Sequence, residues 1–123
     1  MSFDFDELLV SSDVKVYHGG IVTFECADIK EQANIISANQ KRDMFSFEFR
    51  WDRNKILYSI SCVKDSVGSF FGRGFYMDGK ERRYFSVSGG TWENDLVFKG
   101  IWIEAAVIYR FAIDFISLSI VGE

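Results

Sequence analysis

The segment Phe111-Ala-Ile-Asp-Phe-Ile-Ser-Leu-Ser-Ile120 ends the most apolar stretch of this chain, which begins at Trp92. β-Branched and aromatic side chains dominate the stretch, and their restricted χ1 angles favour a pleated strand over a helix. Along a strand, Phe111, Ile113 and Phe115 would share one face, because successive side chains point to opposite sides. We therefore expect two or three long antiparallel strands in this stretch, at the centre of the fold.

Further strand patterns precede this stretch. The clearest alternation runs from Met44 to Trp51 and places four aromatic rings on one face. Asp78-Gly79 separates two strand-like runs and is the strongest kind of short-range hairpin signal. Gly19-Gly20 predicts another hairpin, between strands at residues 14–17 and 21–26. The remaining strands are expected at residues 56–63, 70–77 and 80–87.

One segment has the period of a helix instead. Asp28 and Glu31 match the spacing of a capping box, and Ile29, Ala33 and Ile36 follow at helical spacing. This pattern predicts the one substantial helix at residues 28–39. A short helical turn is also expected near residues 4–9, after an acidic start.

The expected fold is mainly β, in the α+β class. About eight strands joined by short turns favour antiparallel neighbours, and one-sided apolar strands must curl to bury their apolar face. We expect a single domain, residues 1–123, built as a curved antiparallel sheet or half-barrel with the 28–39 helix against it. The connection at residues 104–106 contains no glycine or asparagine, so a turn and a bend in one strand both remain open there.

Composition narrows the class of protein. The 123 residues carry a net charge of −4, and nearly half of them are apolar, which excludes a disordered chain. Cys26 and Cys62 lie in apolar strand-like segments and are expected as reduced thiols. The acidic first residues do not resemble a signal peptide, and Arg110 and Asp114 interrupt the apolar tail. We expect a soluble, cytoplasmic protein without a membrane partner or cofactor.

No arrangement of residues indicates a reaction. His18 is the only histidine and lies beside Gly19-Gly20, where a polar turn residue is the simpler interpretation. Too few His and Cys residues are present for a zinc site. Gly72 and Gly74 lie within a strand and not before a helix, so they predict a bulge or bend and no phosphate-binding loop. The expected protein is therefore non-catalytic.

Basic and aromatic residues interleave in the middle of the chain. Arg73-Gly-Phe-Tyr76 resembles the start of the signature strand of RNA-recognition-motif domains, whose aromatic rings stack on bases. Tyr76 departs from that pattern, which has a small residue at this position. Single-stranded nucleic-acid binding is one alternative, and the overall acidity counts against it. The interleaved residues are Arg50, Trp51, Arg53, Arg73, Phe75, Lys80, Arg82, Arg83 and Tyr84.

Acidic residues gather toward the two ends of the chain. Residues 1–31 contain seven acids and two bases, and residues 91–123 contain five acids and two bases. In size, charge and lack of catalytic signatures, the chain is similar to the small immunity proteins of bacterial toxin systems, such as those of contact-dependent growth inhibition. That resemblance implies a protein-binding module that neutralises a cognate toxin, for instance a basic nuclease domain, by steered and tight association. The expected partner-binding acids are Asp4, Asp6, Glu7, Asp13, Glu93 and Asp95.

A second alternative is a small-ligand binder. The strand pattern from Trp92 to Ile120 resembles the last strands of lipocalin-like barrels, and a curled sheet could enclose an apolar pocket. The competing interpretation is that the aromatic side chains simply fill the core, as in most small barrels. The aromatic residues in question are Phe45, Phe47, Phe49, Trp51, Trp92 and Trp102.

Overall fold

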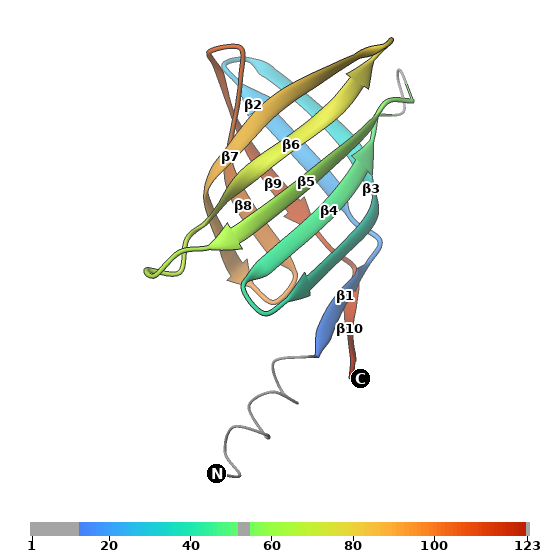
Figure 1. The fold of residues 1–123 in the computed structure, drawn as a ribbon, viewed down its shortest axis with the longest axis vertical. Coiled ribbons are helices and arrows are strands. Elements are labelled where there is room, and N and C mark those ends of the chain that lie inside the picture. The colour runs from blue at the N-terminus through green and yellow to red at the C-terminus, as the bar shows by residue number, and fades with distance from the viewer. Residues whose placement is uncertain (1–12, 52–54, 123) are drawn as a thin grey trace.

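The computed structural model describes residues 13–51 and 55–122. All regular structure within these ranges is β-strand, as Figure 1 shows. The mainly-β prediction is confirmed at this level, although the α-helical part of it is not. The strands are β1 (Val14–His18), β2 (Ile21–Cys26), β3 (Ile29–Lys41), β4 (Met44–Arg50), β5 (Leu57–Lys64), β6 (Phe70–Asp78), β7 (Glu81–Asn94), β8 (Val97–Glu104), β9 (Val107–Asp114) and β10 (Ser117–Val121).

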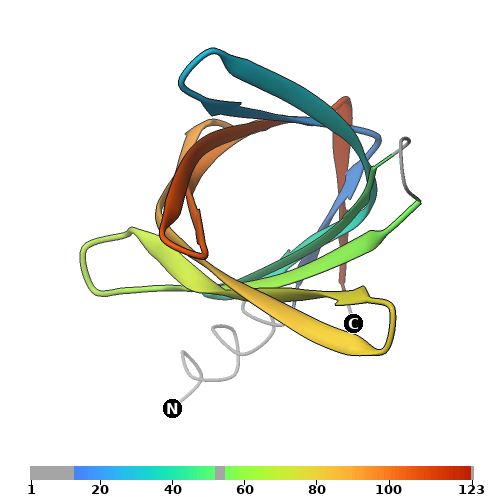
Figure 2. The ribbon, with the colours of Figure 1, turned by 90° about the horizontal axis from the view of Figure 1, so that it is seen from above.

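Strands β2 to β9 form a closed antiparallel barrel, where a curved sheet or half-barrel was expected. Each strand from β2 to β8 pairs with the next along the chain, and β2 pairs with β9 in a register that aligns Val22 with Ile113. Figure 2 looks down the resulting ring of strands. Closure pairs the two edge strands of the sheet, so their backbone groups find partners.

The predicted hairpin at Gly19-Gly20 is wrong. β1 and β2 are not paired with each other; both run along β3, where Val16 aligns with Asn39 and Ile21 with Asn34. The two glycines, with φ of 67° and 136°, bend one long strand into these two parts. β1 then leaves the barrel and pairs with β10, so that a two-stranded ribbon extends from the lower end in Figure 1.

The predicted helix at residues 28–39 is also wrong, because that segment is β3. A bulge between Ile35 and Ser37 shifts the register, so the inward side chains change from odd positions (Ala33) to even positions (Ala38). The shift hides the period of two in the sequence and leaves Ile36 on the outer surface. The helical turn expected near residues 4–9 lies outside the described residues.

The other strand predictions are confirmed, with two refinements. β7 runs through the corner expected at Ser88–Thr91, where a bulge interrupts its pairing with β8. Residues 104–106 form the turn between β8 and β9, and both Ala105 and Ala106 have positive φ, 50° and 66°. Two positive φ angles are typical of the tight hairpin turns that match strand twist.

The barrel interior is filled by aromatic rings fitted to glycines. Phe45, Phe49 and Phe98 are fully buried. A Cβ atom on Gly74 would lie 2.3 Å from the ring of Phe85, so only glycine leaves room for that ring. Gly72 sits at a bulge opposite β7, as predicted. Pairing small with large inward residues fills a tapering barrel at the density of a protein core.

Both thiols are free in the structure. Cys62 faces the core, where burial raises its pKa to about 12, whereas Cys26 is half-buried at the end of β2. None of the described segments forms a helix of the length and apolar character that a membrane crossing requires.

Candidate functional site

A cavity of about 180 Å³ opens at one end of the barrel, which we call the mouth. The mouth is the upper end in Figure 1, where β2 ends, β3 begins and the turn of residues 104–106 lies. The opposite end, from which the β1–β10 ribbon extends, is called the closed end below. Five aromatic rings and two carboxylates line the cavity: Phe24, Trp51, Tyr58, Trp102, Tyr109, Glu31 and Glu104.

Strand alternation brings these side chains together. Trp51 follows the inward series Phe45, Phe47 and Phe49 by two residues, and Glu104 follows the inward Trp102 by two. The inward face of β4 therefore stays aromatic up to the mouth, whereas that of β8 ends there in a carboxylate.

Aromatic rings packed against one another form the floor of the cavity. Phe24 meets Trp102 edge-on, with ring centroids 5.1 Å apart, and Trp102 stacks on Phe85 at 3.6 Å. Phe49 packs beneath Phe24, with centroids 5.4 Å apart. The rings below leave the cavity shallow, so a ligand would occupy the mouth and not the length of the barrel.

Tyr76 fixes one of the two carboxylates. Its hydroxyl donates a hydrogen bond to Oε2 of Glu104 over 2.5 Å, and its ring stacks on Tyr58 with centroids 4.3 Å apart. Burial, reinforced by this bond, raises the pKa of Tyr76 well above that of a free tyrosine. Tyr76 therefore keeps its proton at neutral pH and holds Glu104 in place as a hydrogen-bond donor.

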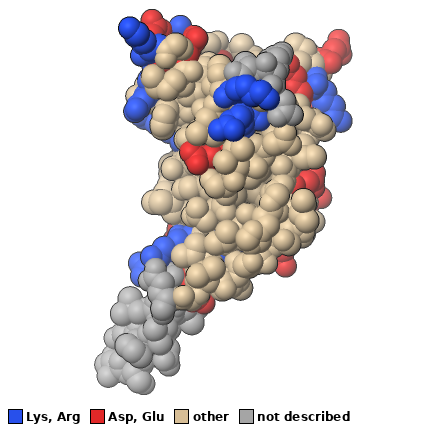
Figure 3. Space-filling model, turned by 90° about the vertical axis from the view of Figure 1, so that its right-hand side faces the viewer, with Lys and Arg blue, Asp and Glu red and all other residues tan. Residues whose placement is uncertain are grey.

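Charged side chains gather around the mouth. Figure 3, which looks onto the side of the molecule at the right in Figure 1, shows Lys, Arg, Asp and Glu concentrated at the upper rim, above a mostly uncharged wall. On the β6–β7 hairpin, Arg83 forms ion pairs with Asp78 (3.4 Å) and Glu81 (3.0 Å). The rim cation at Arg83 is thus partly neutralised by its own neighbours.

The three sequence-predicted acids that the structure describes do not lie at the mouth. Glu93 and Asp95 lie where β7 turns into β8, and Asp13 directly precedes β1, all toward the closed end. Glu93 forms an ion pair with Lys99. Asp4, Asp6 and Glu7 lie outside the described residues. The acids that line a cavity, Glu31 and Glu104, were not singled out, although parity along β8 places Glu104 on the inward face with Trp102.

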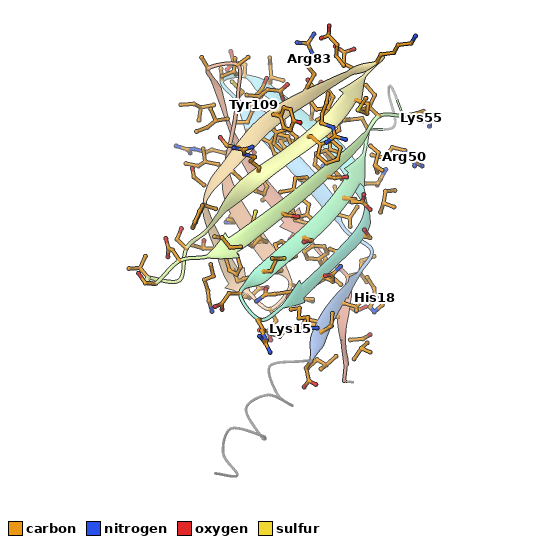
Figure 4. All side chains as sticks on the ribbon, in the orientation of Figure 1. Lys15, His18, Arg50, Lys55, Arg83 and Tyr109 are labelled. Atoms are coloured by element: carbon orange, nitrogen blue, oxygen red, sulfur yellow. The ribbon has the colours of Figure 1, made fainter. Side chains whose placement is uncertain are left out.

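The other sequence candidates lie elsewhere. His18 is on the ribbon, far from Tyr109 in Figure 4, and its Nε2 lies 2.7 Å from Oγ of Ser119. On the outer wall, the guanidinium of Arg82 covers the ring of Phe75 at 4.4 Å, so this ring already has a stacking partner. Among residues 13–51 and 55–122, no group of His, Cys, Asp and Glu side chains could hold a metal ion.

A second hollow, of about 310 Å³, lies on the outer wall over β2, β8 and β9. Glu25, Lys99 and Arg110 border it, and their charges are of both signs. Such mixed charge on a solvated wall selects no ligand class.

The fold and its site define a closed eight-stranded antiparallel barrel with a small aromatic cavity at one end. Compared with known proteins, the chain matches no family model, and neither a curated protein nor a solved structure is significantly similar to it. Its function must therefore be inferred from the geometry of the site.

Proposed function

We propose that this protein is a non-catalytic binding protein whose barrel mouth holds a small molecule. The observation that supports this proposal is the cavity itself, which combines aromatic walls with two carboxylates above a core of buried aromatic residues. Concave, mostly apolar sites with a few convergent polar groups are the usual form of ligand pockets.

The size of the cavity limits the ligand. An apolar cavity of roughly 150 Å³ is enough to hold one benzene molecule. At about 180 Å³, the mouth would accept a molecule of about one ring, or an equally compact aliphatic one. A long lipid chain would have to displace Phe45, Phe47 and Phe49 from the filled interior.

Binding of ring-sized probes tests the proposal. Phenol, benzyl alcohol and benzylamine would be titrated into the protein while amide chemical shifts and tryptophan fluorescence are recorded. We expect shifts to cluster at β3, β8 and β9 beside the mouth, and fluorescence to respond in the wild type and in Trp92→Phe but much less in Trp51→Phe. Trp92 is the matched control, since it lies at the closed end against Tyr17. If none of the probes shifts mouth residues, the proposal is wrong.

Neutralisation of a cognate toxin, in the manner of an immunity protein, is a second proposal. Its support is that Asp13, Glu93 and Asp95 all lie toward the closed end, away from the mouth, so a protein partner would use a separate surface. Burial raises the pKa of the Tyr17 phenol, and the negative charge of nearby Asp95 raises it further. Replacing Asp13 and Asp95 with lysine should weaken the capture of a protein partner from the native host, and it should also reduce the salt dependence of that capture. Unchanged capture would contradict the assignment of this surface.

A further inference from the structure

The carboxylates and aromatic rings of the mouth indicate the chemistry of the ligand, as the volume of the cavity indicates its size. We propose that the mouth selects a compact organic cation, a primary amine or a quaternary ammonium compound. This inference rests on the proposed ligand-binding function and specifies what the same cavity recognises.

The carboxylates give the first argument. Glu31 and Glu104 line the cavity, and the described residues that line it include no lysine, arginine or histidine. An anionic ligand would meet two like charges in a partly desolvated site. A neutral ligand could replace hydrogen bonds that water makes to Glu104, but it would not balance the negative charge of this carboxylate in a partly desolvated site. A cation supplies that charge compensation.

The aromatic walls give the second argument. A cation is attracted to the face of an aromatic ring, most strongly to tryptophan, and the attraction grows as the site is desolvated. Trp51 and Tyr58 come from one side of the mouth, at the end of β4 and the start of β5, and Tyr109 comes from β9. A compact cation in the cavity would therefore contact rings from more than one direction, as in the aromatic cages that bind methylated ammonium groups.

The fixed orientation of Glu104 gives the third argument. Tyr76 holds Oε2 of this carboxylate, and the Tyr76 ring is itself held by stacking on Tyr58. A ligand ammonium group would therefore meet Oε1 of Glu104 in a position that is set before binding. Such pre-organisation lowers the entropy that binding must remove.

A pair of isosteres tests the inference. Choline and 3,3-dimethylbutan-1-ol have the same shape and differ in one atom, a cationic nitrogen in place of a neutral carbon. Both would be titrated by calorimetry and by tryptophan fluorescence at pH 7.5, in low and moderate salt. We expect choline to bind at least about tenfold more tightly than the neutral alcohol, with affinity that falls as salt is added.

Variants of single acids locate the effect. Glu104→Gln keeps the shape of the side chain and should weaken choline binding about tenfold, while binding of the neutral alcohol stays the same. Glu31→Gln should also weaken choline binding. Glu93→Gln is the matched control, because it removes an acid toward the closed end, and it should change neither affinity. A circular dichroism spectrum of each variant checks that the barrel is intact.

The outcomes separate this inference from the proposed function. If the neutral alcohol binds at the mouth as tightly as choline does, the mouth is a ligand site but the preference for cations is wrong. If Glu104→Gln and Glu93→Gln weaken choline binding equally, the effect comes from net charge and the inference again fails. If neither isostere nor any ring-sized probe shifts mouth residues, the proposed function itself is contradicted.

Discussion

The two ends of this barrel are both rich in aromatic residues, yet the cavity that the described residues line lies at one of them. At the closed end, Tyr17 stacks on Trp92 with ring centroids 4.9 Å apart and meets Phe45 edge-on at 5.8 Å. At the mouth, Trp51 and Tyr58 instead border an open space that they share with two carboxylates. Aromatic content alone therefore does not distinguish a packed core from a binding site.

The difference comes from the path of the chain beyond each end. The bend at Gly19-Gly20 brings Tyr17 of β1 under the barrel, and the backbone N–H of Phe115 bonds to the carbonyl of Leu96 over 2.8 Å, which holds the start of the ribbon in place. The mouth has no comparable ribbon among the described residues. Hairpin turns border both ends, and the closed end differs because the chain also returns over it.

The largest expected effect separates the two ends by stability. Phe45→Ala removes a fully buried ring that contacts Tyr17, Trp92 and Phe98, and it should lower the free energy of unfolding by about 3–5 kcal/mol. Trp51→Ala removes a half-buried ring and should cost about 1–2 kcal/mol, while it abolishes probe binding. Urea denaturation measures both costs. Equal losses would contradict the distinction between a packed and an open end.

The second-largest effect is expected at alkaline pH, which should lower the free energy of unfolding through Tyr17 at the closed end. Burial, with a smaller effect of Asp95, raises the pKa of Tyr17 to about 12 from an ordinary value of 10.0. Because the folded state favours the protonated phenol, this stability is complete below pH 10 and is lost as the pH rises from 10 to 12, by about 2–3 kcal/mol. Tyr17→Phe should therefore show a smaller loss of stability over this interval than the wild type.

The control for that experiment is Tyr84→Phe, since Tyr84 is exposed on the outer wall. The free energy of unfolding of Tyr84→Phe should fall with rising pH as that of the wild type does. If Tyr17→Phe and Tyr84→Phe have the same alkaline profile, Tyr17 is not buried in the closed end as described.

The fit of rings to glycines can be broken at one position. A Cβ atom on Gly100 would lie 2.9 Å from the ring of Phe111, so Gly100→Ala should cost about 1–3 kcal/mol by overpacking. Phe111→Leu in the same chain should recover part of that cost, because it shortens the side chain that clashes. A double-mutant cycle measured in urea gives the coupling, and strictly additive effects would show that the two residues do not compete for space.

Substitutions in the turn between β8 and β9 should raise the free energy of unfolding instead of lowering it. Ala105 and Ala106 both have positive φ, a conformation that Asn-Gly adopts more readily than Ala-Ala. Ala105→Asn with Ala106→Gly should raise the free energy of unfolding by about 1 kcal/mol. Thermal denaturation measures the gain. A loss of stability would mean that the alanine side chains make contacts more favourable than the strain they cause.

The smallest effect is expected at the rim. Arg83→Ala removes exposed ion pairs to Asp78 and Glu81 and should change stability by less than about 1 kcal/mol. Choline affinity should rise only slightly, since Arg83 does not line the cavity. Calorimetry measures this change, and a large gain in affinity would show that rim charges govern binding more than the carboxylates inside do.

Much of the fold could be predicted from local patterns. The inward rings of β4 and the shared face of Phe111, Ile113 and Phe115 are buried as alternation predicts, and Asp78-Gly79 joins β6 to β7. The prediction failed for β3, where one bulge reverses the parity of inward residues and leaves an accidental helical spacing. It also failed at Gly19-Gly20, because glycines permit a bend as readily as a turn.

The candidate site could be predicted only in part. Trp51 and Trp102 were among the aromatic residues expected around a possible pocket, whereas Glu31, Glu104 and Tyr76 were not considered for it. Glu31 lay in the segment interpreted as a helix, where it was assigned to a cap. The partner Tyr76 of Glu104 is on β6, and no local pattern relates two residues 28 positions apart.

By itself, the sequence determined most of the strands and which of their faces are apolar, because alternation with a period of two belongs to each strand alone; β3 is the exception, since its bulge breaks that alternation. Only the tertiary structure decided that β2 closes on β9, that the β1–β10 ribbon fills one end, and that two carboxylates meet aromatic rings at the other. Those features depend on register and bending between strands distant in the chain, and such pairings leave no periodic signal in any one of them.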